Sequence, residues 1–291
     1  MGVTDCNKRQ NEPGYKNTIQ NTLSGDSLID VSIQILRDHE PEEGYWVAFS
    51  GGKDSIVIYD LVKRAGVKHD VHFNQTTIDP PEIYSFIKEY YPEIQWEKPK
   101  RSMFAAIRSR QIPPTRQIRY CCAELKEIHG TGRVVVTGVR RQESNSRRNK
   151  TEYSQSHLNE QTWYCNPIIS WSDSDVWGYI HSNHLAYPSL YDEGYDRIGC
   201  VMCPLQNKYG MLRDAVRFPR HYRAYLRAFK KMLLNCKERN EDIVNLRWKT
   251  PEDVMYWWIY GIQHDDPHPE WWLLPDDPLF ELKRFKKRRN I

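Results

Sequence analysis

The sequence lacks any apolar run of the length that a membrane-spanning helix requires, which is about 20 residues. Its first residues, MGVTDCNKRQNEPGYKN, also lack the apolar segment of a secretory signal. They fall short of the myristoylation pattern as well, because Cys6 stands where Ser or Thr is required. We therefore expect a cytoplasmic protein that has no membrane partner.

A large excess of charge of either sign is also missing, since the 291 residues carry a formal net charge of only +4. This value is too small to indicate nucleic-acid binding by itself. Basic residues are nevertheless concentrated in RRQESNSRRNK at 140–150, in the segment 220–240 and in the final KRFKKRRNI. These segments are candidates for contacts with a phosphate backbone, although a basic tail is equally well explained as a solvated end.

An even number of cysteines is also lacking, since the chain has seven. In the expected reducing compartment, clustered cysteines bind metal or carry out redox chemistry rather than form disulfides. Cys121 and Cys122 are adjacent in RYCCAELK, whereas Cys200 and Cys203 form a CxxC pair in GCVMCP. Four thiolates suit Zn²⁺ or an iron–sulfur cluster, and the residues alone leave both open. Three cysteines have no assigned role: Cys6, Cys165 and Cys236.

Hydrophobic periodicity predicts an α/β fold. Short apolar runs such as YWVAFS and RVVVTGVR indicate buried strands, and segments with helical spacing, such as DSIVIYDLVKRAG, lie between them. Strands that alternate with helices indicate a parallel sheet flanked by helices. Further helices are predicted at 172–185, at 220–240 and after Thr250. We expect three regions, namely a loose arm at 1–25, a core at 26–205, and a helical, aromatic and basic lobe at 206–291.

The stretch SGGKDS stands between the first strand and the helix that follows it. Helix N-termini bind phosphates because unpaired N–H groups and the helix dipole converge there. Glycines let the backbone approach an anion, hydroxyls donate hydrogen bonds, and a lysine adds charge. The aspartate is explained if it caps the helix or holds Mg²⁺ that bridges the phosphates. The predicted anion site therefore consists of Ser50, Gly51, Gly52, Lys53, Asp54 and Ser55.

This hexapeptide resembles the PP-loop of the ATP pyrophosphatase superfamily and differs from the GxxxxGK[ST] pattern. Over residues ~45–205, the segments PTRQIRYCCAELK, TGVRRQESNSR and IGCVMCP are similar to the PAPS/APS reductase family. The resemblance implies an adenine nucleotide alpha hydrolase-like fold. It also implies that ATP binds at the loop and is cleaved between its α and β phosphates, with Lys53 and Asp54 in catalytic roles.

The same resemblance assigns the remaining candidate residues. In the assimilatory APS reductase branch, a CC…CxxC quartet binds [4Fe–4S], which implies a cluster on Cys121, Cys122, Cys200 and Cys203. TGVRRQES resembles a loop that holds nucleotide phosphate or sulfate, which implies that Arg140 and Arg141 are catalytic and that Ser144 binds the nucleotide. NQTTIDPPE corresponds to the loop after the family's second strand, which implies nucleotide contacts from Thr77 and Asp79.

One feature of the family's reductases is missing, namely a nucleophilic cysteine in a C-terminal Glu-Cys-Gly-type motif. After Cys203 the chain has only Cys236, in LLNCKERN. The reductases also depart from an intact SGGKDS, because they bind an adenylyl sulfate. The intact loop with the quartet most resembles the ATP pyrophosphatases of DNA phosphorothioation systems (Dnd and Ssp types). This resemblance implies that AMP activates an oxygen of the DNA backbone for replacement by sulfur.

The implied partners are DNA, in preference to tRNA, a cysteine desulfurase as sulfur donor and other phosphorothioation proteins, with a homodimer as one compatible assembly. Two further hypotheses stay open. One is a sulfonucleotide (PAPS/APS) reductase or a tRNA thiolation enzyme, and pyrophosphate release from ATP with DNA, tRNA or neither separates it from the first. The other is a non-catalytic ATP- or DNA-binding module, in which Lys53→Ala or Asp54→Ala could abolish binding without any loss of sulfur product.

Overall fold

The computed structural model describes residues 27–127, 129–156, 159–238 and 248–261. The predicted loose arm, Cys6 and the basic KRFKKRRNI tail lie outside these residues. The described chain forms two compact units that interleave along the sequence. Unit 1 comprises residues 27–75, 81–98 and 129–199, and unit 2 comprises residues 76–80, 99–127 and 200 onward.

Unit 1 is built on a six-stranded sheet with the order β3-β2-β1-β4-β6-β5. All neighbouring strands are parallel except β5 and β6, which are antiparallel. The register places Trp46 of β1 opposite Asp70 of β2 and Val135 of β4. The strands are β1 Tyr45–Ala48, β2 His69–Asn74, β3 Gln95–Glu97, β4 Val134–Val136, β5 Tyr153–Gln155 and β6 Trp163–Cys165.

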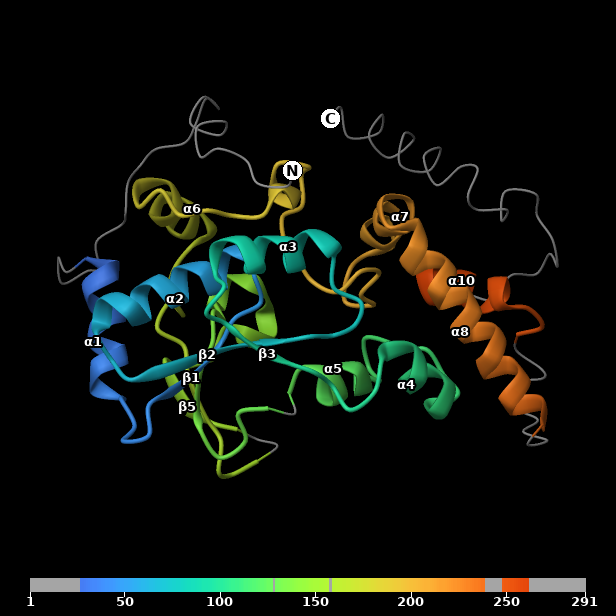
Figure 1. The fold of residues 1–291 in the computed structure, drawn as a ribbon, viewed down its shortest axis with the longest axis horizontal. Helices are drawn as coiled ribbons and strands as arrows, with labels where there is room; N and C mark the ends of the chain where they lie inside the picture. Colours follow the sequence, from blue (N-terminus) through green and yellow to red (C-terminus); the bar gives the residue numbers. More distant parts are fainter. Residues whose placement is uncertain (1–26, 128, 157–158, 239–247, 262–291) are drawn as a thin grey trace. The chain divides into compact units, whose positions relative to one another are not determined.

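Four helices accompany this sheet, and Figure 1 shows α2 and α3 on the same side of the strands. They are α1 Leu28–Asp38, α2 Lys53–Ala65, α3 Pro81–Tyr90 and α6 Asp173–Ser182. The core between helices and sheet is apolar, and Val47, Leu61 and Ile180 are completely buried in it. The predicted α/β fold, a mostly parallel sheet flanked by helices, is therefore confirmed.

Local sequence signals explain where these helices begin and end. Ser27 caps α1 by accepting a hydrogen bond from the N–H of Ile29. Ser172 and Asp175 form a capping box at the start of α6. Gly66 ends α2 in the left-handed conformation, with φ at +71°, which glycine adopts without a steric penalty. Short 3₁₀ turns complete the unit at η2 Arg141–Glu143, η3 Asn145–Arg147 and η4 Ser189–Tyr191.

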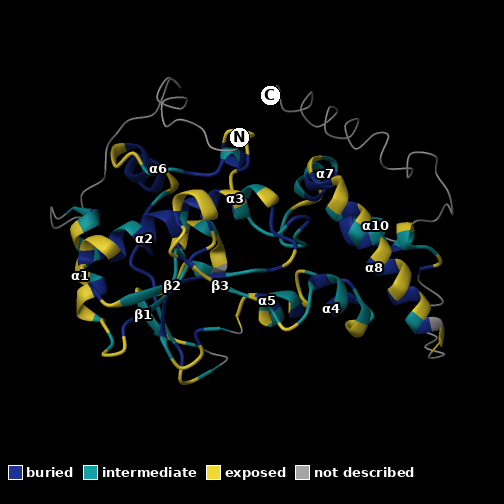
Figure 2. Ribbon diagram, viewed as in Figure 1, coloured by how far each residue is buried: buried dark blue, intermediate teal, exposed yellow. Residues whose placement is uncertain are grey.

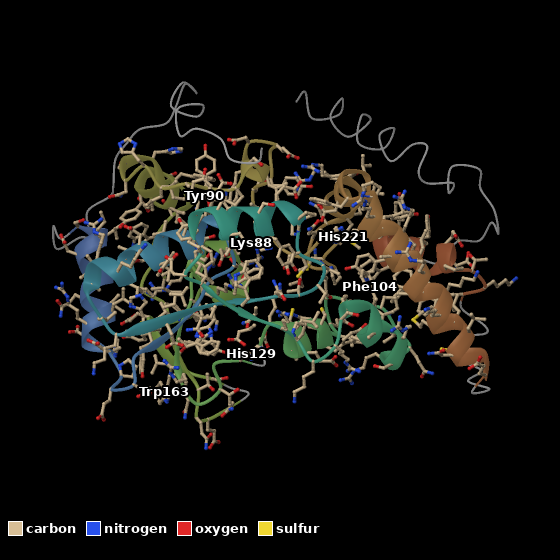
Figure 3. All side chains as sticks on the ribbon, in the orientation of Figure 1. Lys88, Tyr90, Phe104, His129, Trp163 and His221 are labelled. Carbon is tan, nitrogen blue, oxygen red and sulfur yellow. The ribbon has the colours of Figure 1, made fainter. Side chains whose placement is uncertain are left out.

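Unit 2 is helical over its described residues. Its helices are α4 Met103–Arg110, α5 Tyr120–Leu125, α7 Lys208–Arg217, α8 Pro219–Glu238 and α10 Pro251–Tyr260. Tyr225 of α8 packs edge-on against Phe104 of α4, which Figure 3 labels, and its ring also contacts Trp258 of α10. The indole N–H of Trp258 donates a hydrogen bond of 2.6 Å to the carbonyl of Pro114. These aromatic side chains form the core of the unit.

The predicted helices are present in both units, at α6, α8 and α10. Figure 2 shows buried and exposed residues alternating along α8, as its amphipathic sequence predicts. No helix among the described residues combines the length and the apolar character needed to span a membrane.

Candidate nucleotide site and cysteine cluster

The SGGKDS loop lies at the carboxyl end of β1, and the TGVRR segment lies at the carboxyl end of the adjacent strand β4. From β1 the chain continues to β2 and β3 on one side of that strand, and then returns to place β4 on the other side of β1. In open parallel sheets, ligands bind at this point of reversal, outside the carboxyl ends of the strands. Gly138 permits the two segments to meet, because a Cβ there would lie 2.9 Å from the Cβ of Asp54.

The loop has a tightly bonded backbone. Gly51 has φ at +74°, and a Cβ added to it would lie 3.0 Å from Ile83. The hydroxyl of Ser55 donates to the carbonyl of Gly52 at 2.8 Å and accepts from the N–H of Ser50 at 3.2 Å. Gly52 is the N-cap of α2, so the helix begins at Lys53 and directs its first N–H groups toward the loop. The strand, turn and helix start that the sequence predicted around SGGKDS are therefore present, and anion binding by the turn stays a prediction.

Two buried cations meet at this turn, and each contacts two carboxylates. The ammonium of Lys53 lies 3.5 Å from Asp54 Oδ2 and 3.2 Å from Asp173 Oδ1. The guanidinium of Arg140 lies 2.7 Å from Asp54 Oδ1 and 3.0 Å from Asp173 Oδ1. The Lys53 and Arg140 side chains are each 4% exposed. The structure thus brings together three predicted residues, and it adds Asp173, the first residue of α6, which was not predicted as a site residue.

The two predicted arginines have different surroundings. Arg140 is buried in the charge cluster, whereas the side chain of Arg141 is exposed and donates to the carbonyl of Lys150 at 2.9 Å. Ser144 is exposed between η2 and η3. Of these three predicted residues, Arg140 is the one that contacts the charged side chains at the loop in the contacts given above.

Tyr191 is a second residue at the loop that sequence reasoning missed. Its hydroxyl oxygen accepts a hydrogen bond of 2.8 Å from the backbone N–H of Lys53, the first residue of α2. Trp177 and Tyr187 pack edge-on against its ring and hold it in place. Burial raises the pKa of the phenol, so the group remains neutral. No local pattern marked Tyr191, because it is far from the loop in the sequence.

The four predicted cluster cysteines all belong to unit 2, where each is half-buried. Cys121 and Cys122 lie in the first turn of α5, and their thiols share a hydrogen bond. This bond and the guanidinium of Arg119 lower the pKa of Cys122 to about 6. The same bond and burial raise the pKa of Cys121. Cys200 and Cys203 are close enough to Cys121 for their charges to contribute to its raised pKa.

Positive charge lies beside these thiols. Arg119 donates to the sulfur of Cys122 at 3.9 Å, and the negative field of Cys200 raises the pKa of Lys126. The thiol of Cys200 lies 3.5 Å from the hydroxyl of Thr76. Burial raises the pKa of Cys200, and the neighbouring Lys126 ammonium offsets part of this effect.

Thr77 and Asp79, the two predicted nucleotide contacts from the second-strand loop, have local partners in unit 2. The carboxylate of Asp79 accepts from the N–H and the hydroxyl of Thr76, both at 2.7 Å. The hydroxyl of Thr77 accepts from the N–H of Met103 at 3.0 Å, and its backbone has φ at +65°. These contacts order the turn that carries Thr76 toward Cys200.

The predicted metal sites are not supported by the geometry. Within the part of the chain that the structure describes, no three or more His, Cys, Asp and Glu residues are arranged to hold a metal ion. Four thiols beside Arg119 and Lys126 have suitable chemistry for an anionic cluster, but they do not surround a common metal position. The [4Fe–4S] cluster and Mg²⁺ therefore stay predictions.

Comparisons with known proteins place these features in a family. Residues 44–206 match the model of the phosphoadenosine phosphosulfate reductase domain. The chain is 29% identical to the adenosine 5′-phosphosulfate reductase of Geobacillus kaustophilus over 187 residues, which is 60% of this chain and 78% of that protein. It is 30% identical over 193 residues to the uncharacterized protein MJ0973 of Methanocaldococcus jannaschii, covering 63% of this chain but only 47% of that protein.

Among solved structures, the chain is similar to the phosphoadenylyl-sulfate (PAPS) reductase from Candida auris, solved as a phosphate complex. The TM-score is 0.46 and the identity 20%, with 63% of this chain and 97% of that chain covered. The family match spans more than half of the chain and includes both the SGGKDS loop and the cysteine pairs. The chain therefore belongs to the phosphoadenosine phosphosulfate reductase domain family.

Proposed function

We propose that the chain is an enzyme that binds an adenine nucleotide at residues 50–55 and acts on the nucleotide's phosphate or sulfate end. The observation that carries this proposal is the meeting of Lys53 and Arg140, both buried, at the N-terminus of α2. A pair of buried cations beside helix N-terminal N–H groups is suited to a multiply charged anion. The family membership supports a nucleotide as that anion.

The residues at the loop have separate tasks in this proposal. The amides of α2 and the Lys53 ammonium hold the anionic groups and stabilise the charge that develops on the leaving group. Arg140 offers a planar, two-pronged donor that fits a phosphate or sulfate. Asp54 holds Arg140 in position through its 2.7 Å contact. Such fixed donors act without reorganising during the reaction.

The first candidate substrate is an adenylyl sulfate, which a sulfonucleotide reductase would consume. The support is that relatives such as those from Geobacillus kaustophilus and Lysinibacillus sphaericus are named adenosine 5′-phosphosulfate reductases. A reductase also needs an attacking thiol. Among the described cysteines outside the quartet, Cys165 and Cys236 are 0% and 1% exposed, so neither can reach a substrate. The thiol would come from the quartet, from Cys6 or from a partner.

The second candidate substrate is ATP, whose cleavage would transfer AMP to an oxygen of a nucleic-acid backbone. The intact SGGKDS sequence supports it, and so does the charge of the two units. Over the described residues, unit 2 carries 17 Lys and Arg against 7 Asp and Glu, whereas unit 1 carries 14 against 20. One exposed stripe of α8 presents Arg220, Arg223, Arg227 and Lys230 at helical spacing.

This stripe is suited to a phosphate backbone. Under the second candidate, DNA would bind unit 2, ATP would bind with Mg²⁺ that faces Asp54, and a cysteine desulfurase would supply sulfur. DNA phosphorothioation is then the overall outcome. It is tested by comparing phosphorothioate in DNA from cells with and without the gene, and an unchanged sulfur content would rule out this substrate.

One product assay separates the two candidates. The purified protein is incubated with a dithiol reductant and either adenosine 5′-phosphosulfate or ATP with Mg²⁺, in the presence and absence of DNA. A reductase releases AMP and sulfite from the sulfonucleotide, whereas a pyrophosphatase releases pyrophosphate from ATP. Lys53→Ala is the negative control in both arms. If the unaltered protein neither binds nor consumes either nucleotide, the proposed function is wrong.

The predicted cluster has its own test, which is independent of turnover. Iron, sulfide and zinc are measured in protein purified under anaerobic conditions. Iron and sulfide in a stoichiometry near four each would support the cluster on the quartet. Zinc without iron would overturn it and would assign the four thiols to a structural zinc site instead.

A further inference from the structure

Asp173 occupies the position on the two cations that an anionic ligand would take. Its Oδ1 lies 3.2 Å from the Lys53 ammonium and 3.0 Å from the Arg140 guanidinium, so one oxygen bridges both. The aspartate is the first residue of α6, and its backbone N–H donates to the side chain of Gln142 at 2.8 Å. It comes from a different element than the loop and approaches the loop's cations from α6.

The exposure of the charged groups distinguishes Asp173 from the others. The Lys53 and Arg140 side chains are 4% exposed, and Asp54 is 21% exposed, whereas Asp173 is 53% exposed. Asp173 is therefore the member of the set that can most easily exchange its cation contacts for water. Asp54, by contrast, is held within the hexapeptide by its neighbours and by Gly138.

The charge of the set leads to the same conclusion. Lys53 and Arg140 with Asp54 alone carry one net positive charge, and Asp173 reduces it to zero. A phosphate or sulfate that enters the neutral set must separate Asp173 from the cations or accept repulsion at short range. The cations do not depend on Asp173 for their placement, since Lys53 also contacts the Asp196 carbonyl at 3.3 Å and Arg140 keeps Asp54.

We propose that Asp173 is a built-in counter-ion of the nucleotide site, which competes with the phosphate or sulfate groups of the ligand and sets their affinity. This inference rests on the proposed binding of a nucleotide at residues 50–55. Asp173 turns into solvent when the anion binds and returns when it leaves. The buried cations are thereby neutralised in the empty enzyme, and weakly charged competitors gain little by displacing the carboxylate.

The test uses Asp173→Asn and Asp173→Ser, since serine is well tolerated in the first turn of a helix. Asp30→Asn is the matched control, because Asp30 is an exposed aspartate in the first turn of α1. Binding of pyrophosphate, ATP and adenosine 5′-phosphosulfate is measured by calorimetry in EDTA, so that no divalent cation bridges the carboxylates. Thermal unfolding midpoints verify that each variant is folded.

We expect both Asp173 variants to bind pyrophosphate and the nucleotides about fivefold more tightly, the scale of a partly exposed ion pair. Their affinity should also fall more steeply with added salt, because a net positive site attracts anions over a longer range. Asp30→Asn should match the unaltered protein.

Unchanged or weaker binding by both folded Asp173 variants would overturn the counter-ion role and would indicate that Asp173 only orients Lys53 and Arg140. This failure is distinct from that of the proposed function, which is wrong if the unaltered protein binds neither nucleotide with or without Mg²⁺. In that second case no ligand competes with Asp173, and the inference fails as well.

Discussion

At the residue scale, the loop depends on single atoms that come from distant parts of the chain. The Lys53 N–H is bonded to the Tyr191 hydroxyl, although 138 residues separate the two. SGGKDS could be predicted as an anion site from sequence, because its residues are consecutive. Asp173 and Tyr191 could not, since only the fold brings them to the loop. Arg140 and Arg141 were indistinguishable in sequence. In the structure, the side chain of Arg140 contacts Asp54, whereas that of Arg141 contacts the carbonyl of Lys150.

Tyr191→Phe should lower the free energy of unfolding by about 1–3 kcal/mol, because the buried N–H of Lys53 loses its acceptor. Tyr187→Phe is the control, since its hydroxyl makes a longer contact, of 3.4 Å, with Asp192 in the same aromatic cluster. Urea denaturation of both variants measures the difference. Equal losses of stability in the two variants would show that the hydrogen bond to Lys53 contributes nothing specific.

At the element scale, the predicted helices formed because their caps are local in sequence. Ser172 accepts from the N–H of Asp175, and Asp175 in turn accepts from the Ser172 N–H at 2.7 Å, so α6 has a defined start. The strands β5 and β6 were not predicted. Each has three residues, too few for alternation to be visible. They are determined by tertiary pairing, of β6 with β4 and of β5 with β6. Cys165, which had no assigned role, is the buried last residue of β6.

Ser172→Ala should cost about 1 kcal/mol of stability, the usual value for loss of an N-cap. Ser182→Ala at the exposed end of the same helix should cost less than half of that. The measurement is chemical denaturation at pH 7. A loss of the same size at both positions would contradict the capping role.

Strand β2 carries a pH-sensitive ion pair. Burial alone would raise the pKa of Asp70, but hydrogen bonds from Arg133, at 2.6 Å, and from His72 outweigh it and lower the pKa. A lowered carboxyl pKa stabilises the fold above the unfolded value of about 3.9 and loses this contribution as pH falls through the folded pKa. Between pH 7 and pH 3, Asp70→Asn should therefore lose less unfolding free energy than the unaltered protein. Identical pH profiles in acid denaturation would refute this.

At the scale of the whole molecule, the two units differ in charge, which the mild net charge of the chain conceals. The predicted basic helix lies in unit 2 and the anion loop in unit 1. The periodicity predicted a helix at α8, but not that so much of the positive charge gathers in its unit. Segments far apart in sequence, such as 99–127 and 200–238, make up that unit.

Charge reversal on α8 tests whether this surface binds nucleic acid. Arg223→Glu, Arg227→Glu and Lys230→Glu together should weaken DNA binding and reduce the salt slope by about three, one for each cation that no longer neutralises a phosphate. The matched control reverses three exposed lysines of unit 1, Lys68, Lys88 and Lys98. Fluorescence anisotropy at several salt concentrations gives both the affinity and the slope. Equally weakened binding in the two triple variants would exclude a specific role for α8.

The central claim, that residues 50–55 hold an adenine nucleotide, is tested most directly by isothermal titration calorimetry. ATP with Mg²⁺ and adenosine 5′-phosphosulfate are each titrated into the unaltered protein, Lys53→Ala and Lys63→Ala. Lys63→Ala is the matched control, because Lys63 is on the same helix and lies over the Tyr59 ring. We expect at least one of the two nucleotides to bind the unaltered protein, and Lys63→Ala to bind that nucleotide with the same affinity. Binding by Lys53→Ala should be at least about tenfold weaker, since hydrogen bonds to charged groups contribute about 1.5–3 kcal/mol. Equal affinity for Lys53→Ala, or no binding by the unaltered protein, would contradict the account.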